Sequence, residues 1–408
     1  MKKTILLYLM TVLLVGVHTS SSAQQNHLFT GSFEACKAQA AKENKMIVID
    51  LYFEGCMPCK QMDDQVFPDP AVVKLLTPDF ILFKTDVFKE EDGMKLARKY
   101  GASGFPTYVM VDAAGKAMLI EAGFFAVDRF VPLLQKAKAL RDAGQFLAFD
   151  TDLDKEYPAY YNHRYMRKGE KGEIAELRTY LQGKDLSQEV PFVVSTLVND
   201  AEINQFVYAN LPLLVQKYSS TLLLNKVNTI AGQKLQEHGQ LKQLDGMKKT
   251  LDYIRPVYND RLWTVFMPSF IASYYKGGQD ADAYLTLAES YDIFPTWAHR
   301  SNALGEVIIA QKDNAVFLER LKKEYLTEQR KSELDNSDQY KLSLIYAYLG
   351  DYQAAAASLQ PLLTLDLSSP MYALKSEDVQ ALQAAIAKKD LSAFQAKNVK
   401  KAIPMKMD

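Results

Sequence analysis

Cysteine is scarce in this chain of 408 residues, which contains only Cys36, Cys56 and Cys59. Disulfide-stapled scaffolds have many more cysteines for their length, so this chain does not belong to that class. Zinc is poorly supported as well, because a site around Cys56 and Cys59 would need two more ligands. Besides Cys36, the only candidates after residue 23 are four scattered histidines: His27, His163, His238 and His299.

An excess of charge of either sign is also absent. The chain has 48 Lys and Arg against 49 Asp and Glu, a formal net charge of −1, and no long basic block. Nucleic acids and anionic membrane surfaces attract strongly basic proteins, so neither is an expected partner. The sequence contains no flavin or nicotinamide fingerprint, and we expect no cofactor.

The one long apolar run near the N-terminus is short for a membrane span. Lys2 and Lys3 precede a mostly apolar stretch over residues 5–17, and small residues follow at 21–23. A bilayer needs about 20 apolar residues, so a cleavable signal peptide over residues 1–23 is favoured over a membrane anchor. No cysteine lies near the cleavage site, so a lipid-anchored form is not expected. We therefore expect export to the periplasm, a mature chain from Gln24, and no stable membrane insertion after cleavage.

The most informative stretch is residues 46–60. Residues 46–53 are apolar and β-favouring, as in a strand that is buried on both faces. After Glu54 and Gly55, Cys56-Met57-Pro58-Cys59 begins a predicted helix that continues to about residue 66. A cysteine at a helix N-terminus faces unpaired N–H groups and the positive end of the helix dipole, which favour the thiolate. We expect Cys56 to be exposed there.

This spacing allows Cys56 to attack a disulfide in another molecule and Cys59 to release the mixed disulfide. A structural disulfide is the plainer alternative, but so short a loop removes little unfolded-state entropy. Half of a zinc site is the other alternative. Redox exchange is the favoured interpretation of the pair. Cys36 recurs at helical spacing with Phe33 and Ala40, which favours burial as a small apolar residue.

Several features together resemble the thioredoxin family over residues 32–144. Asp50 stands six residues before Cys56, Pro58 stands between the cysteines, and residues 104–108 (GFPTY) resemble the family's cis-proline segment. Predicted helices and strands follow in the order α-β-α-β-α-β-β-α. The resemblance implies an α/β thioredoxin fold, a central mixed sheet flanked by helices, within residues 24–148.

The resemblance also implies roles for individual residues. Asp50 would be a buried acid with a raised pKa that accepts the proton of Cys59, and Lys84 would accompany it. A water-facing carboxylate and an ordinary ion pair remain the alternatives for these two. The partner-binding surface would comprise four residues: Phe105, Pro106, Met57 and Pro58. For Pro106, an edge-strand proline is the alternative to the cis form.

Two departures from thioredoxin affect the expected activity. Gly55 replaces a tryptophan before Cys56, and the two tryptophans of the chain lie later, at Trp263 and Trp297. No histidine lies between the cysteines, which favours a reductase over a strong oxidase. The predicted partners are disulfide-containing or thiol proteins and a membrane thiol carrier that donates electrons.

From residue 149 the pattern becomes helical and continues so to residue 408. We predict an all-α, helical-repeat-like domain of stacked helix pairs there. Residues 348–355 (YLGDYQAA) resemble the turn of a tetratricopeptide unit, although no clean repeat period is present elsewhere. The alternative function is therefore a helical partner-binding protein whose thioredoxin-like domain is an accessory or a redox sensor.

Overall fold

The computed structural model describes residues 28–367 and 373–401, so the predicted signal peptide lies outside the described residues. Contacts divide the chain into two compact units. The first runs to Ile230 and includes Ile254–Tyr258, and the second comprises Ala231–Tyr253 and the residues from Asn259 onward. Within the described residues, no helix is both long and apolar enough to cross a membrane.

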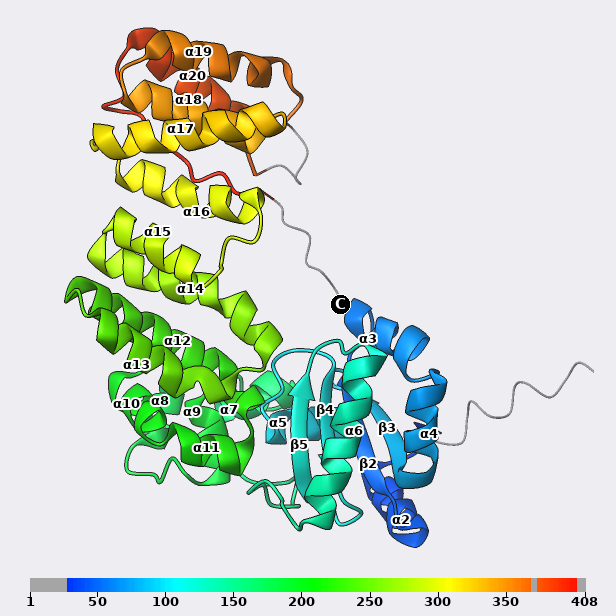
Figure 1. Cartoon of the computed structure of the whole chain (residues 1–408). Coiled ribbons are helices and arrows are strands. Elements are labelled where there is room, and N and C mark those ends of the chain that lie inside the picture. The colour runs from blue at the N-terminus through cyan, green and yellow to red at the C-terminus, as the bar shows by residue number, and fades with distance from the viewer. Residues whose placement is uncertain (1–27, 368–372, 402–408) are drawn as a thin grey trace, which may run out of the picture. The chain divides into compact units, whose positions relative to one another are not determined.

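A five-stranded mixed sheet forms the centre of the first unit (Figure 1). Its strands lie in the order β1-β3-β2-β4-β5. In this sheet β3 is parallel to both β1 and β2, whereas β4 is antiparallel to β2 and β5. The strands are β1 (Leu28–Phe29), β2 (Met46–Tyr52), β3 (Phe80–Asp86), β4 (Thr107–Val111) and β5 (Ala117–Ala122).

Helices cover both faces of this sheet. They are α2 (Phe33–Glu43), α3 (Met57–Gln61), the π-helix η1 (Met62–Val66), α4 (Pro70–Asp79), α5 (Glu91–Lys99) and α6 (Val127–Asp142). On one face, η1, α4 and α6 contribute to a single apolar cluster. On the other, Phe33 of α2 packs on Phe83 of β3 with ring centroids 5.5 Å apart. The predicted thioredoxin fold is confirmed.

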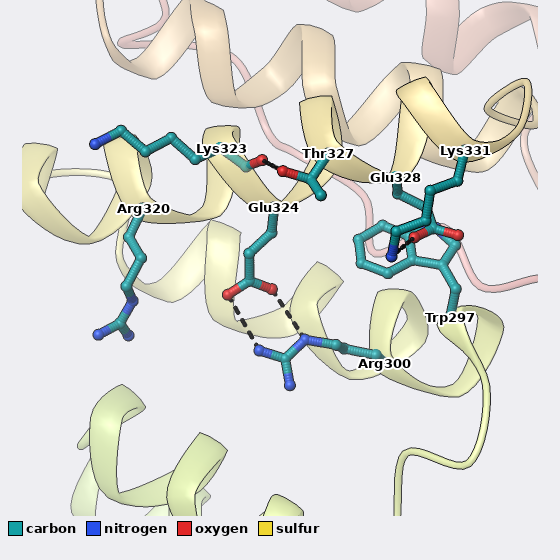
Figure 2. A pocket seen from close by; sticks show the side chains of 8 residues that line it. All are labelled: Trp297, Arg300, Arg320, Lys323, Glu324, Thr327, Glu328 and Lys331. Atoms are coloured by element: carbon teal, nitrogen blue, oxygen red, sulfur yellow. Dashed lines mark hydrogen bonds and ion pairs between the residues drawn. The ribbon is translucent and has the colours of Figure 1, made fainter.

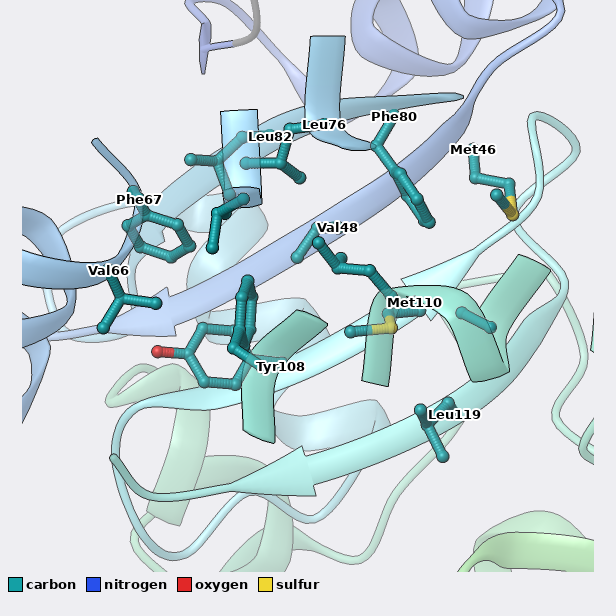
Figure 3. Packing of buried hydrophobic residues seen from close by; sticks show 14 of the residues in the cluster. Met46, Val48, Val66, Phe67, Leu76, Phe80, Leu82, Tyr108, Met110 and Leu119 are labelled. Carbon is teal, nitrogen blue, oxygen red and sulfur yellow. The ribbon is translucent and has the colours of Figure 1, made fainter. Parts of the chain in front are cut away.

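Packing in this apolar cluster explains which positions of the strands are apolar (Figure 3). Side chains alternate along a strand, so residues two apart share a face. Met46 and Val48 of β2 pair in register with Phe80 and Leu82 of β3, and Val48 also pairs with Met110 of β4. All five are buried in one core. The next row across the same strands breaks the apolar pattern and begins the functional site.

The first unit continues past the predicted boundary between residues 148 and 149. Lys99 Nζ at the end of α5 lies 2.6 Å from Glu189 Oε1 and donates to the Asp152 carbonyl at 2.9 Å. Tyr161 Oη donates to the Arg98 carbonyl at 2.9 Å. The first unit therefore contains helices from beyond residue 148, as does the second unit. The predicted boundary between the thioredoxin-like and helical domains stays a prediction.

Helices make up the rest of the described chain, as predicted. Those that begin before residue 231 are α7 (Ala159–Met166), α8 (Ala175–Leu181), α9 (Glu189–Ser195), α10 (Ala201–Ala209), α11 (Leu211–Tyr218) and α12 (Ser220–Gln240). Those that follow are α13 (Leu244–Ile254), η2 (Arg255–Val257), α14 (Asp260–Gly278), α15 (Ala281–Ser290), α16 (Trp297–Ala310), α17 (Ala315–Lys331), α18 (Asn336–Tyr348), α19 (Tyr352–Leu359), η3 (Gln360–Thr364) and α20 (Ser376–Lys388).

The tetratricopeptide-like turn lies between α18 and α19. Gly350 adopts a φ of +79°, a left-handed conformation that glycine tolerates and that ends a helix. Ser343 Oγ of α18 donates to the Ala355 carbonyl of α19 at 2.8 Å, so the two helices pack closely. The predicted helical-repeat-like stacking of helix pairs across the domain stays a prediction.

Candidate functional site: the Cys56–Cys59 pair and its surroundings

Cys56 and Cys59 form a disulfide at the start of α3, with their Cα atoms 5.3 Å apart. Cys56 is the N-cap residue, and its Sγ accepts the N–H of Cys59 at 3.3 Å. The expectation of an exposed Cys56 is wrong for this oxidised state, since Cys56 is 6% exposed and Cys59 3%. The disulfide holds the two side chains against each other and against the first helical turn. Met57, at 68%, is the exposed residue of the motif.

Gly55 allows the sharp turn from β2 into α3. Its φ of +91° lies in a region that residues with a side chain rarely adopt. The Cys56 N–H closes this turn by donating to the Phe53 carbonyl at 3.1 Å. This backbone conformation gives a physical reason for glycine where the family resemblance places tryptophan.

Asp50 continues the row of Met46 and Val48 but carries a carboxylate into the core. The Asp50 side chain is fully buried. Lys84 pairs with Asp50 in the β2–β3 register, and its Nζ lies 3.3 Å from Asp50 Oδ2. Burial raises the pKa of Asp50 to about 6, and the nearby Lys84 charge only partly opposes this effect. The structure thus brings together the predicted acid and lysine, and the proton-accepting role stays a prediction.

Asp63 is a neighbour that the sequence analysis missed. It lies on η1, where the Phe67 N–H donates to the Met62 carbonyl at 2.9 Å, and its carboxylate forms an ion pair with Lys84. Its charge raises the pKa of Asp50 further. Burial alone would lower the pKa of Lys84, but Asp50 and Asp63 together outweigh burial and raise it. The acidic residues after the motif were a visible signal, yet α-helical periodicity does not predict a π-turn.

Tyr108 completes the row on the other side of Asp50. It pairs with Asp50 in the β2–β4 register and is fully buried. Within the described residues, its hydroxyl has no hydrogen-bond partner, which is unusual for a buried polar atom. Burial and the Asp50 charge hold the pKa of Tyr108 well above its ordinary value. Tyr108 belongs to the GFPTY segment, and no feature of the sequence predicted a role for its hydroxyl.

An aromatic cluster of Phe53, Phe88 and Phe105 lies at the same edge of the sheet. The rings are mutually in contact, with centroids 5.3 Å (Phe53–Phe88), 5.6 Å (Phe53–Phe105) and 6.2 Å (Phe88–Phe105) apart. They follow β2 and β3 and precede the antiparallel β4, and these three strand ends meet at one edge. The Phe105–Pro106 peptide bond is cis, and the Pro106 carbonyl accepts the Gly123 N–H at 2.8 Å.

Comparison with known proteins agrees with this geometry. A family model described as a thioredoxin-like domain matches residues 33–138. These residues form a thioredoxin-like domain. The match covers the whole Cys56–Cys59 site but leaves most of the helical region outside.

Curated relatives of the thioredoxin-like domain include thiol:disulfide interchange proteins named DsbD. The protein from Pasteurella multocida is 29% identical over 133 residues, which cover 31% of this chain and 23% of the relative. The protein from Pectobacterium atrosepticum is 32% identical over 98 residues, which cover 24% of this chain and 17% of the relative. The chain therefore spans less than a quarter of the length of these relatives.

Among solved structures, a thioredoxin from Thermus thermophilus is 28% identical to this chain. The match covers 29% of this chain and 90% of that thioredoxin, with a TM-score of 0.24. The thioredoxin fold of this domain is shown by the family model and by the strand order of the sheet.

The second compact unit contains a separate hollow of about 450 Å³ between α16 and α17 (Figure 2). Both of its carboxylates are paired, because Arg300 makes two hydrogen bonds to Glu324, at 2.9 and 3.1 Å, and Lys331 pairs with Glu328 at 3.1 Å. Arg320 and Lys323 add two further cations to the lining. This hollow contains no cysteine or histidine. Across the described residues, no group of three or more His, Cys, Asp or Glu could hold a metal ion.

Proposed function

We propose that this protein is an exported thiol-disulfide oxidoreductase that reduces or exchanges disulfides in partner proteins. The observation that carries the proposal is the Cys56–Cys59 disulfide at the start of a helix in a thioredoxin-like domain. The buried Asp50, with a pKa of about 6, lies in the strand that leads to this pair and supports it.

In the proposed reaction, the Cys56 thiolate attacks one sulfur of a partner disulfide. That disulfide breaks, its other sulfur leaves as a thiolate that takes a proton from solvent, and Cys56 forms a mixed disulfide. Asp50 then accepts the proton of Cys59, and the Cys59 thiolate attacks the Cys56 sulfur. The partner leaves with both sulfurs reduced, and the protein is left oxidised, with a new Cys56–Cys59 disulfide.

A second dithiol must return two electrons before the next turnover. We assign this task to a membrane thiol carrier that exchanges disulfides with the same pair in the periplasm. The reductive direction is supported by Met57-Pro58 between the cysteines, because this segment has no histidine to stabilise the Cys56 thiolate. Met57, Pro58, Phe105 and Pro106 would contact the partner.

Insulin reduction by single-cysteine variants tests this proposal. We expect Cys56→Ser to abolish the activity, because it removes the attacking sulfur, and Cys59→Ser to trap partners as mixed disulfides. Cys36→Ala is the matched control, since Cys36 is a free, buried cysteine in α2. We expect this variant to reduce insulin as fast as the parent. A Cys56→Ser variant that reduces insulin as fast as the parent would remove the proposal.

The long helical region supports a second candidate, a partner-binding protein in which the disulfide is an accessory or a redox sensor. Helices continue from α7 to α20, beyond the residues that match the family model. Under this alternative, a variant with both Cys56 and Cys59 replaced by serine would retain the partner and the cellular role. Under the first proposal, that variant would lose the role.

A further inference from the structure

Arg167 connects the helical region to the edge of the thioredoxin-like domain that contains the disulfide. It is the C-cap residue of α7, with a φ of +53°, and its guanidinium lies 3.8 Å from the centre of the Phe88 ring. Arg167 lies outside the residues that match the thioredoxin-like family model. This chain therefore adds a cation to the site from a segment that the family match does not include.

Contacts with α5 hold α7 in this position. Arg98 Nη1 donates to Asn162 Oδ1 at 2.7 Å, and Tyr161 Oη donates to the Arg98 carbonyl at 2.9 Å. Tyr161 is fully buried, so the base of α7 is fixed on the domain. Arg167 follows six residues after Tyr161, at the end of the same helix, and is positioned by this packing.

The Phe88 ring places Arg167 beside the proposed partner-binding surface. Phe88 contacts Phe53, whose carbonyl accepts the Cys56 N–H, and Phe105, which precedes Pro106. Phe88 itself remains 38% exposed. A polypeptide that reaches Cys56 across these rings would pass the guanidinium.

The other charges near this edge have partners. Glu54 pairs with Lys89, Lys60 pairs with Asp64 at 2.7 Å, and Lys168 lies 4.0 Å from Glu91. Among the described residues, no carboxylate lies within ion-pair distance of the exposed Arg167. With its guanidinium over the Phe88 ring, Arg167 still carries N–H groups that can donate hydrogen bonds, and a carboxylate is the acceptor that best matches a guanidinium.

We infer that Arg167 is a specificity-determining residue that favours partner segments with Asp or Glu close to the reactive cysteine. The inference rests on the proposed function, since it concerns the partner of the same disulfide. An exposed ion pair contributes modestly, so we expect a preference of about two- to fivefold in kcat/KM.

Two disulfide-bonded peptides that differ only in Glu or Lys beside the reactive cysteine provide the test. The full-length parent, in its reduced form, should reduce the Glu peptide faster. Arg167→Gln should make the two rates equal, and Arg167→Glu should reverse the preference. Lys168→Gln is the matched control, because it removes the same charge from the next residue and should preserve the preference. The preference should shrink in about 0.5 M salt, which screens exposed charges.

Insulin reduction by the same proteins separates the possible failures. If Arg167→Gln retains the preference of the parent, or if the parent has none, the inference is wrong, while normal insulin reduction leaves the proposed function in place. If the parent reduces neither insulin nor either peptide, the proposed function is wrong and the inference fails with it.

Discussion

Asp50 is the residue at which this site departs most from ordinary packing. Its neighbours in the same row of β2, Met46 and Val48, are apolar, and so are Phe80 and Leu82, which precede Lys84 in β3. A carboxylate in that row loses hydration, and a single lysine restores only part of the lost stability. The raised pKa of Asp50 therefore means that its ionised form lowers the free energy of unfolding.

We predict that replacing Asp50 with Asn stabilises the oxidised protein at neutral pH. The pKa of Asp50 is about 6 in the folded state against an ordinary 3.8, so the unfolded chain ionises first as the pH rises. Below about pH 4, Asp50 is protonated in both states and does not lower the free energy of unfolding. As the pH rises through about 6, ionisation of the unfolded chain lowers the free energy of unfolding, by about 3 kcal/mol at pH 7. Urea unfolding of the parent and Asp50→Asn from pH 4 to 8 measures this difference. A constant difference over that range would contradict it.

A second prediction concerns the effect of Asp63 on the pKa of Asp50, with the neighbouring Asp64 as a matched control. Asp63 pairs with Lys84, whereas Asp64 pairs with the exposed Lys60. Asp63→Asn removes a negative charge near Asp50 and leaves Lys84 to pair with Asp50 alone, and both effects lower the pKa of Asp50.

The titration of the Asp50 carboxyl, followed by NMR, measures this change. We expect its midpoint to move to lower pH in Asp63→Asn and to stay close to the parent value in Asp64→Asn. Equal midpoints in all three proteins would show that Asp63 does not act on Asp50.

Some residues of the site could be predicted from their positions in the sequence, and others could not. Cys56, Cys59 and Asp50 lie within ten residues of one another, and Lys84 breaks the apolar pattern of its own strand. The contact of Asp63 with Lys84 and the unpaired hydroxyl of Tyr108 depend on how separate segments meet. The burial of Cys56 also depends on side chains that the local sequence does not specify.

At the scale of elements, strong apolar runs were the most predictable. The strand predicted over residues 46–53 is β2 (Met46–Tyr52), because this stretch is a short run of apolar and β-branched residues. The predicted order of elements also includes β3, β4 and β5 in their observed places. The two-residue β1 was missed, since it is too short to show a period. The predicted helix from Cys56 to about residue 66 is α-helical only to Gln61 and then becomes the π-helix η1, which is a correction to the prediction.

The link between α5 and α9 provides a test of how these elements depend on one another. Lys99 and Glu189 are both buried and lie 2.6 Å apart. Removing one member of a buried ion pair leaves the other unpaired, so we predict that Lys99→Met lowers the free energy of unfolding by about 3–5 kcal/mol. Replacing both residues with methionine should recover part of this loss.

Lys95→Met is the control for that prediction. Lys95 also lies on α5, but its partner Asp154, 2.8 Å away, is exposed, so the loss should stay below about 1 kcal/mol. Urea unfolding curves of the three variants provide the comparison. Similar small losses in Lys99→Met and Lys95→Met would show that α9 contributes little to the stability of the thioredoxin-like domain.

At the scale of the whole molecule, the thioredoxin-like domain is only part of a larger compact unit. The first unit continues to Ile230, and helices beyond the family match supply Glu189 to Lys99 and Arg167 to Phe88. The change in sequence pattern near residue 149 marked where strands give way to helices. It did not reveal these contacts, because they join residues that are far apart in the chain.

The redox potential of the Cys56–Cys59 pair, measured in the full-length protein by equilibration with glutathione, tests the central claim most directly. We expect a reversible two-electron couple with a potential near the value of about −270 mV that is typical of thioredoxin, because no histidine separates the cysteines. A potential near about −120 mV, as in strong oxidases, would contradict the reductive direction. A pair that does not exchange with glutathione at all would contradict the claim that this disulfide is redox-active.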